Sequence, residues 1–453
     1  MLERGSNPES APNTIALNRI RNAEPEISET NLLNGAKLIS VVHPDAVQTS
    51  VGVIFDAGSR RENPGEHGQM HFFEHLPPGS FRITSGGTDL QRLSQARSWD
   101  SNIMVTKEML SIALTGPDFD GEQMLSAVTA MLNPESDALK AIFDIEKTRI
   151  INEIIQRSCA QQEIRDALFS TLFMKDTGYD HPIGGTPQEV QGYTFEQVME
   201  AGRRLLTPDN ATFIVSGKPD FTGQVFKAFE SASLPGSGPR PSGLPELRSN
   251  TTVDDLPQVN AAIAPPIPGL EVCAWLPGLN KGNSKEHLAL EVATGLLSGH
   301  VSSELSHRQG VTYGAGAIPR QYPENGYVEI GFNTDPRNGP NIPALLAKTL
   351  EEFPATITPE KVAEYYSASR NYWYQNAQDI TSFDVLAELA RRPQSFVIPV
   401  STKLEKLQEI SAEDVRAAAE QFFNPEKLRL GYLGSPPALQ AAGAVPNVTL
   451  PFA

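Results

Sequence analysis

The sequence is poor in cysteine. Its 453 residues include only two, Cys159 and Cys273, and these lie too far apart to form a Cys-x-x-Cys pair. Isolated cysteines of this kind predict free, buried thiols in a reducing compartment rather than a disulfide framework.

Long apolar runs are also missing. No stretch reaches eighteen consecutive apolar residues, so the sequence predicts no transmembrane helix. The first residues, Met1–Ser6, lack the apolar core of a secretory signal, and they do not form an arginine-rich transit peptide. We therefore expect a cytoplasmic protein, with the mitochondrial matrix after presequence removal as the alternative.

Basic residues are few relative to acidic ones. The 37 lysines and arginines stand against 54 aspartates and glutamates, which gives a net charge of −17. This balance argues against nucleic acid as a partner. An acidic surface favours basic peptides or simply keeps a protein soluble, and the composition leaves both alternatives open.

Chain length and an internal repeat indicate two domains. At 453 residues the chain is too long for one ordinary hydrophobic core. An apolar run leading to Gly and then Asn occurs at 53–63 and again at 273–283, an offset of 220 residues. A helix start, a Pro-containing turn and an apolar strand occur at 193–219 and again at 410–436, an offset of 217. Two matches at nearly one offset predict a duplicated unit of roughly 200 residues.

We place the two homologous domains at 28–234 and 255–453. The linker between them, 235–254, begins with a Gly-, Pro- and Ser-rich stretch that cannot hold a regular element. Short strands and amphipathic helices are both present without strict alternation, which favours an α+β fold with a mainly antiparallel sheet packed with helices in each domain. Helices are predicted at 122–133, 142–157, 342–353 and 359–377.

The residues with catalytic potential concentrate between Gln69 and Leu76. His71 and His75 lie four residues apart, so on a helix their side chains share one face. Two neutral imidazoles on one face can bind zinc and leave coordination positions open. Glu74 lies beside them, where it can take a proton from a metal-bound water. The order His-x-x-Glu-His is that of inverzincins, and a chance match on an ordinary helix surface is the competing interpretation.

A catalytic zinc usually takes three protein ligands and a water, so a third ligand is needed. Glu146 and Glu153 lie seven residues apart, about two helical turns, and therefore share one face of the helix predicted at 142–157. Glutamates on an amphipathic helix usually face solvent, so this segment taken alone does not make either residue a ligand.

The sequence resembles the pitrilysin/insulinase family of metallopeptidases, and most closely its half-size branch, which includes mitochondrial processing peptidase and the respiratory core subunits. The resemblance extends from about residue 30 to residue 436. It rests on the His71 motif, the Glu146/Glu153 pair, and shorter segments at 33–35, 56–60, 181–186 and 208–210.

The resemblance implies roles for individual residues. The family's third zinc ligand is a glutamate on a later helix, which corresponds to Glu153. Glu146 corresponds to a glutamate that supports the site, and the implied cofactor is Zn²⁺. Asn102 falls where the family has an asparagine on the strand that binds the substrate backbone.

The C-terminal half resembles the family's metal-free copy. At the offset of 220, the three motif residues correspond to Glu291, Thr294 and Gly295, which form no ligand set. The family places an arginine and a tyrosine in this half, and Tyr313 matches the tyrosine.

The arginine position aligns with Ser306, and Arg308 can replace the arginine only if the local backbone allows it. Loss of the arginine is expected of the metal-bearing member of a heterodimer whose homologous partner supplies the Arg/Tyr pair; a homodimer is the alternative assembly. It also fits a decaying enzyme.

Two prolines follow the motif directly. Proline disfavours helical geometry in the residue before it and lacks a backbone donor. Pro77 and Pro78 therefore predict that the helix ends almost at His75, which would leave that histidine in a frayed last turn.

The resemblance implies a zinc metalloendopeptidase subunit that hydrolyses peptides or unfolded segments inside a closed chamber. Substrate would bind as an extended strand at a sheet edge. The alternative is a non-catalytic core or scaffold subunit that retains the zinc motif, and a third interpretation is a metal-binding protein with no peptidase role.

Overall fold

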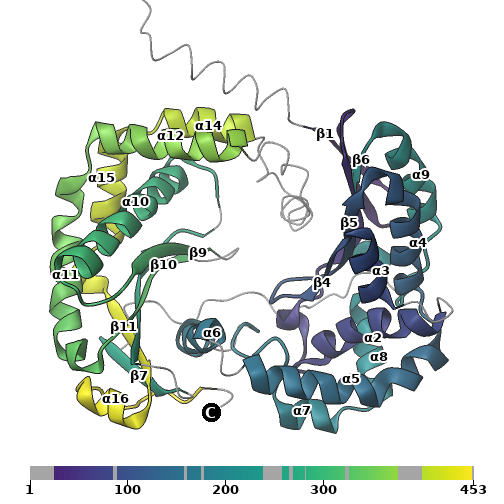
Figure 1. Cartoon of the computed structure of the whole chain (residues 1–453), viewed down its shortest axis with the longest axis horizontal. Helices are drawn as coiled ribbons and strands as arrows, with labels where there is room; N and C mark the ends of the chain where they lie inside the picture. The colour runs from purple at the N-terminus through teal and green to yellow at the C-terminus, as the bar shows by residue number, and fades with distance from the viewer. Residues whose placement is uncertain are drawn as a thin grey trace, which may run out of the picture.

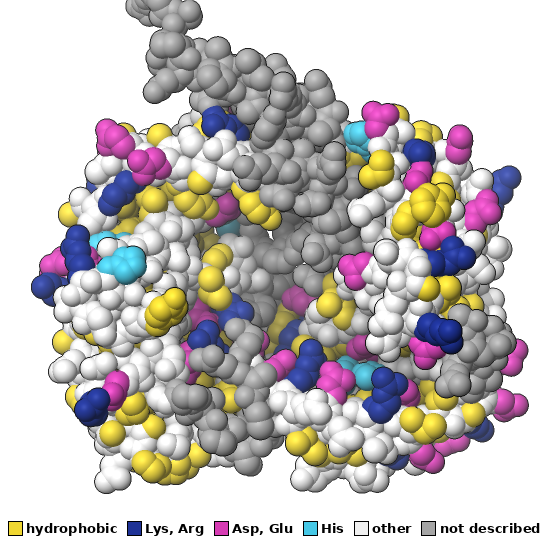
Figure 2. All heavy atoms as spheres, in the orientation of Figure 1, with side chains coloured by type: hydrophobic (Ala, Val, Ile, Leu, Met, Phe, Trp, Pro, Cys, Tyr) yellow, Lys and Arg dark blue, Asp and Glu magenta, His cyan; other side chains and the backbone are white. Residues whose placement is uncertain are grey.

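The computed structural model shows two α+β halves, each with a sheet that faces the other half and helices on its outer side (Figure 1). The predicted fold class is confirmed. A space-filling view shows the molecule hollowed between the halves (Figure 2). The structure describes residues 25–84, 89–157, 161–174, 178–237, 258–264, 269–280, 282–321, 326–375 and 400–450.

The N-terminal half contains a six-stranded sheet in the order β1-β2-β6-β3-β5-β4. Strands β2 and β6 pair in parallel, and the other neighbours pair antiparallel. The strands are β1 (Glu26–Asn31), β2 (Lys37–Val42), β3 (Gln48–Phe55), β4 (Asp100–Val105), β5 (Leu110–Pro117) and β6 (Ala211–Gly217). The helices are η1 (Ser59–Arg61), α2 (Gln69–Thr84), α3 (Leu90–Arg97), η2 (Asp118–Asp120), α4 (Gly121–Leu132), α5 (Ser136–Arg157), α6 (Gln161–Phe173), α7 (Pro187–Gly192), α8 (Phe195–Leu205), η3 (Pro208–Asn210) and α9 (Pro219–Glu230).

The C-terminal half contains a five-stranded sheet in the order β7-β11-β8-β10-β9. Strands β7 and β11 pair in parallel, and the other neighbours pair antiparallel. The strands are β7 (Val259–Ile263), β8 (Leu270–Gly278), β9 (Ala315–Gln321), β10 (Gly326–Thr334) and β11 (Arg429–Gly434). The helices are α10 (Lys285–Ser302), η5 (Ser303–Arg308), η6 (Pro336–Asn341), α11 (Ile342–Glu352), η7 (Pro354–Thr356), α12 (Pro359–Gln375), α14 (Val400–Gln408), α15 (Ala412–Phe422), η9 (Pro425–Lys427) and α16 (Pro436–Ala441).

Corresponding helices of the two halves begin in the same way. Thr194 caps α8 and Ser411 caps α15, and each forms a capping box with the residue three positions later. The apolar residues behind each cap are buried at helical spacing, so both helices pack one face on the rest of their half. The four helices predicted from the sequence are present as α4, α5, α11 and α12, with ends within a few residues of the prediction except for the start of α5.

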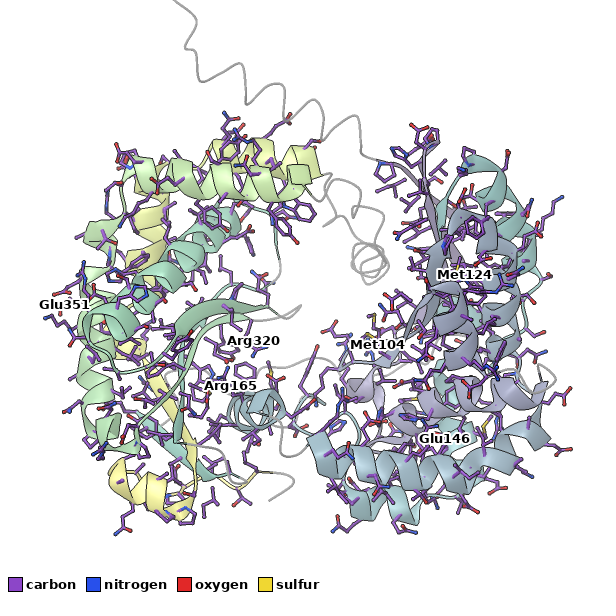
Figure 3. All side chains as sticks on the ribbon, viewed as in Figure 1. Met104, Met124, Glu146, Arg165, Arg320 and Glu351 are labelled. Atoms are coloured by element: carbon purple, nitrogen blue, oxygen red, sulfur yellow. The ribbon has the colours of Figure 1, made fainter. Side chains whose placement is uncertain are left out.

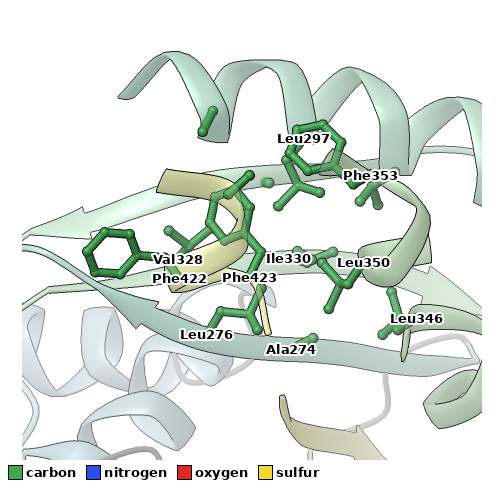
Figure 4. Close-up of a cluster of buried hydrophobic side chains, with 14 of the residues drawn as sticks. Ala274, Leu276, Leu297, Val328, Ile330, Leu346, Leu350, Phe353, Phe422 and Phe423 are labelled. Atoms are coloured by element: carbon green, nitrogen blue, oxygen red, sulfur yellow. The ribbon is translucent and has the colours of Figure 1, made fainter. Parts of the chain in front are cut away.

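Each half has its own hydrophobic core between the sheet and the outer helices. In the C-terminal half, Val328 and Ile330 of β10 belong to a buried cluster with Leu297, Phe353 and Phe423 (Figure 4). Strands β3 and β8 are buried along almost their whole length. The second face of β8 is covered by α6, whereas Ile54 on the second face of β3 packs with Ile39 and Ile214 of neighbouring strands.

Helix α6 belongs to the first half of the sequence but packs on the sheet of the second half (Figure 1). Phe169 and Phe173 of α6 contact the indole ring of Trp275 on β8. Arg165 of α6, labelled in Figure 3, forms an ion pair with the fully buried carboxylate of Glu271. Helix α6 therefore joins the two halves through an aromatic cluster and a buried charge pair.

The prediction that the motif helix ends at His75 is wrong. Helix α2 continues to Thr84 and includes Pro77 and Pro78. Each proline removes one backbone donor and crowds the carbonyl four residues earlier. Packing against α4, α5 and α8 offsets that cost along the length of the helix, and Ser80 donates its hydroxyl to the carbonyl of Pro77 at 2.9 Å. His75 therefore lies in the middle of a helix.

None of the described helices combines the length and apolar character needed to cross a membrane. Cys273 is buried and forms no disulfide, and burial raises the pKa of its thiol. Cys159 and most of the predicted linker, from residue 238 to residue 254, lie outside the described residues.

Candidate metal centre

A buried acidic residue anchors the start of α2. Glu62 accepts hydrogen bonds from the backbone N–H of Gly68 at 2.8 Å and of Met70 at 2.7 Å. The first N–H groups of a helix have no partner within it, and a carboxylate at this end also interacts favourably with the helix dipole. His71 follows Met70 directly, so Glu62 fixes the turn that carries the first histidine.

The two histidines of α2 project toward Glu153 of α5. Nε2 of His71 lies 3.7 Å from Oε1 of Glu153, and Nε2 of His75 lies 3.3 Å from Oε2. One ligand atom from each of the three residues lies within 4.8 Å of the other two. Ligands around a tetrahedral zinc ion lie about 3.4 Å apart, given bonds of about 2.0–2.1 Å. The nitrogen and carboxylate donors therefore fit zinc in both chemistry and spacing.

Gly79 leaves room for two side chains of α5 against α2. A Cβ atom at this position would lie 2.8 Å from a side-chain carbon of α5 and 3.1 Å from Oε1 of Glu146. One turn earlier on the same face, Nδ1 of His75 lies 3.2 Å from Oε2 of Glu146. Arg149 donates to the other oxygen of Glu146 at 2.8 Å. Glu146 thus orients His75 so that its Nε2 faces the other donors, as carboxylates behind metal-binding histidines commonly do.

The carboxylates around the histidines favour a cation at this position. Burial alone would lower the pKa of His75, but hydrogen bonds to Glu146 and Glu153 raise it to about 9. Hydrogen bonds to the two histidines hold the pKa of Glu153 well below its usual range. Burial opposes ionisation of Glu146, yet the hydrogen bond to His75 lowers its pKa. Metal binding at such a cluster requires that a cation displace the proton on the imidazole.

Glu74 lies beside the three donors. Its Oε2 atom is 4.0 Å from Nε2 of His71 and accepts a hydrogen bond from the backbone N–H of Val105 at 3.1 Å. Burial raises the pKa of Glu74. A carboxyl group with a raised pKa is suited to accept and return a proton near neutral pH.

Two residues that position the motif, Glu62 and Gly79, were not predicted from the sequence. The sequence features that could have indicated them are weak: Glu62 is an acidic residue shortly before a helix, and Gly79 is a glycine one turn after the second histidine. The segment that contains His181 entered only through the family resemblance. In the structure, Nε2 of His181 lies 3.4 Å from Oε2 of Glu62, so this segment packs behind the start of α2.

The predicted substrate-binding residues are not all brought together. Asn102 lies half-buried on β4, the edge strand that also carries Val105. Tyr313 is fully exposed, and Arg308 is 69% exposed and pairs with Glu304 at 2.7 Å. Among the described residues, neither Tyr313 nor Arg308 forms a hydrogen bond or ion pair with the three donors.

The corresponding positions of the C-terminal half hold no ligand set. Glu291 of α10 forms an ion pair with Lys403 at 3.0 Å. Thr294 donates its hydroxyl to a backbone carbonyl of its own helix. Gly295 lies under the ring of Tyr365, because a Cβ atom there would be 2.3 Å from the ring. The space that holds the donors in the first half is filled by an aromatic ring in the second.

The chain matches one family model, described as the Peptidase M16 inactive domain, over residues 193–368. An uncharacterised zinc protease of Mycobacterium leprae is 23% identical over 423 residues, which cover 88% of this chain and 89% of the relative. The beta subunit of mitochondrial-processing peptidase from Blastocladiella emersonii is 21% identical over 441 residues, which cover 90% of this chain and 89% of the relative. The crystal structure of a protease from Helicobacter pylori has a TM-score of 0.73 at 17% identity and covers 91% of this chain and 100% of the other.

Proposed function

The chain belongs to the half-size branch of the M16, or pitrilysin, peptidase family, and from that premise we propose that it is a zinc metalloendopeptidase subunit. Its zinc would be held by His71, His75 and Glu153. The observation that carries the proposal is the convergence of these three side chains, with Glu74 beside them. The zinc-protease relative supports it, because the alignment extends over both halves of the chain.

Each residue of the cluster has a chemical task in this proposal. Bound zinc would lower the pKa of a water molecule and polarise a peptide carbonyl. Glu74 would accept the proton of that water and return it to the leaving amine. Glu146 would hold His75 in the tautomer that presents Nε2 to the metal. An extended peptide would lie along β4, with Asn102 beside it.

A homologous second chain would complete the enzyme. Ser306 donates its hydroxyl to the carbonyl of Tyr313 at 2.9 Å and carries no positive charge. Arg308 points to Glu304 instead. We therefore propose that an Arg/Tyr pair comes from a homologous partner subunit, in a heterodimer like that implied by the processing-peptidase relatives. A homodimer, which would lack this pair, is the alternative assembly. The paired chains would enclose peptides or unfolded segments in a chamber.

The second candidate is a core or scaffold subunit that keeps the zinc motif without cleaving. The exposed Arg308 and the serine at position 306 favour it. The match to a family model described as inactive does not bear on the site, because the matched segment begins at residue 193, after Glu153.

Metal analysis combined with a peptide assay separates the two candidates. We expect purified protein to carry about one zinc ion per chain, following the three-ligand pattern. Glu74→Gln should keep the zinc and lower peptide cleavage by about 100-fold or more. Thr294→Ser, at the corresponding position of the C-terminal half, should leave both unchanged. Protein without zinc, or zinc-loaded protein that cleaves nothing even with its co-purified partner, would establish the scaffold role.

A further inference from the structure

We propose that Glu74 caps the empty edge of β4 and that a peptide strand binding to this edge releases the carboxylate. The inference rests on the proposed function, since it assigns Glu74 a second role that is coupled to substrate binding. It concerns the contact between the side chain of Glu74 and the backbone N–H of Val105, at 3.1 Å.

Strand β4 is the outermost strand of its sheet, so half of its backbone groups point away from β5. The N–H of Thr106 bonds to Met109 across the hairpin at 2.8 Å, which sets the alternation along the strand. The backbone N–H and C=O groups of Ser101, Ile103 and Val105 therefore face the open edge. Within the described residues, the N–H groups of Ser101 and Ile103 have no acceptor, and that of Val105 is bonded to Glu74.

An added strand needs these same groups. Backbone pairing at a sheet edge uses every second N–H and C=O along the strand. A peptide that extends along β4 as far as Val105 therefore competes with Glu74 for one donor. When the peptide carbonyl takes the N–H of Val105, the carboxylate of Glu74 loses that bond and can turn toward the reacting atoms. Glu74 would thus be freed when a strand is in place.

The C-terminal half shows how the same edge can be closed. Four residues separate β4 from β5, and four separate β9 from β10, so Ile103 corresponds to Pro319 and Ser101 to Ala317, at an offset of 216. Pro319 has no N–H to offer. The N–H of Ala317 is bonded to the hydroxyl of Ser298 at 3.0 Å.

Among the described residues, the edge of β9 therefore lacks one donor at Pro319 and has another bonded to Ser298, whereas of the N–H groups at the open edge of β4 only that of Val105 is bonded, to Glu74. In Figure 3, Met104 of β4 and Arg320 of β9 are labelled on the sides of the two sheets that face each other. A peptide between the halves thus meets one edge with two open N–H donors, on β4, and one edge, on β9, where a proline interrupts the pairing pattern.

A double-mutant cycle on zinc-loaded protein tests the cap without interference from cleavage. Glu74→Gln keeps an acceptor for the N–H of Val105, and Glu74→Ala removes it, while neither variant retains the base. We expect a fluorescein-labelled, unstructured peptide to bind Glu74→Ala about 2- to 10-fold more tightly than Glu74→Gln, the range of one hydrogen bond. In a Val105→Pro background this difference should disappear, because both residues act on the same bond.

Ile103→Pro is the matched control, since β9 already carries proline at the corresponding position. It should weaken peptide binding equally when combined with Glu74→Gln and with Glu74→Ala, because it removes a donor that only the peptide uses. An equal difference in the wild-type and Val105→Pro backgrounds, or no binding by any variant, would overturn the proposal. Failure of the wild-type protein to cleave would instead count against the peptidase function. The double-mutant cycle would still test the cap, because it measures peptide binding and not cleavage.

Hydrogen exchange gives a direct readout of the cap if Val105→Pro fails to fold. The amide of Val105 should exchange slowly in Glu74→Gln and at least about tenfold faster in Glu74→Ala, because the loss of a protecting bond opens the amide to solvent. Amides of β5 serve as the internal reference. Equal exchange at Val105 in the two variants would contradict the cap.

Discussion

The two halves share one fold but use the space beside their first long helix in opposite ways. In the N-terminal half, α2 directs two histidines toward Glu153 on α5. In the C-terminal half, the corresponding helix α10 pairs Glu291 with Lys403, and Gly295 lies under the ring of Tyr365. The comparison teaches that the helix pair provides a framework and that a few side chains decide whether it holds a polar site or a closed core.

Loss of one histidine should produce the largest difference between the halves. His75→Ala removes a donor that the other two cannot replace, so zinc content should fall from about one ion per chain to near zero. Glu291→Ala breaks a partly exposed ion pair in the C-terminal half and should leave zinc content unchanged. Metal analysis after dialysis measures both, and retention of zinc by His75→Ala would show that the metal lies elsewhere.

The link between the halves should respond strongly to the loss of Arg165. Arg165→Met removes a cation that pairs with the fully buried carboxylate of Glu271. Breaking a buried pair from one side typically costs about 3–5 kcal/mol in the free energy of unfolding, and chemical denaturation measures it. Adding Glu271→Gln should recover part of the loss. A change below about 1 kcal/mol would mean that the pair is already solvated.

Gly295 of the C-terminal half should not accommodate a larger side chain without loss of stability. A methyl group at Gly295 would meet the ring of Tyr365 at 2.3 Å. Gly295→Ala should therefore lower the free energy of unfolding by about 1–3 kcal/mol, the usual cost of overpacking. Combining it with Tyr365→Leu should restore stability, and thermal unfolding checks both. Destabilisation that persists in the double variant would place the strain outside this contact.

Gly79 and Gly299 occupy corresponding positions at the offset of 220, and substituting each with alanine should give the smallest of these differences, in zinc affinity. Gly79→Ala places a methyl group against the side chains of Ile142 and Glu146 and should weaken zinc binding by up to about tenfold, because Glu146 supports His75. Gly299 has open space around it, so Gly299→Ala should leave zinc affinity unchanged and raise stability by about 0.5–1 kcal/mol. Competition with a chelator measures affinity, and equal affinities of the two variants would contradict the packing argument.

Local sequence patterns predicted the parts of the site that depend on local geometry. His71 and His75 share a face because a helix repeats every 3.6 residues, and the capping boxes at Thr194 and Ser411 mark helix starts by side-chain chemistry. The choice of Glu153 needed a family resemblance, because helix periodicity shows which residues share a face but not what that face meets.

The features that the sequence could not predict arise from contacts between distant segments. Helix α2 passes through Pro77 and Pro78 because α4, α5 and α8 pack against it, and local propensity rules do not include that packing energy. The bond from Val105 to Glu74 joins residues 31 positions apart. The close approach at Gly79 is likewise visible only when α5 is in place.

Helix α6 limits how the two repeats can be separated. It is encoded within the first repeat, yet it completes the inner layer of the second sheet against Trp275 and Glu271. A fragment cut at the linker would leave the aromatic side of α6 uncovered in one piece and the indole of Trp275 uncovered in the other. Exposed apolar surfaces of this kind promote aggregation. Each repeat therefore buries part of its surface only in the presence of the other, so we expect two fragments cut at the linker to be more stable together than apart.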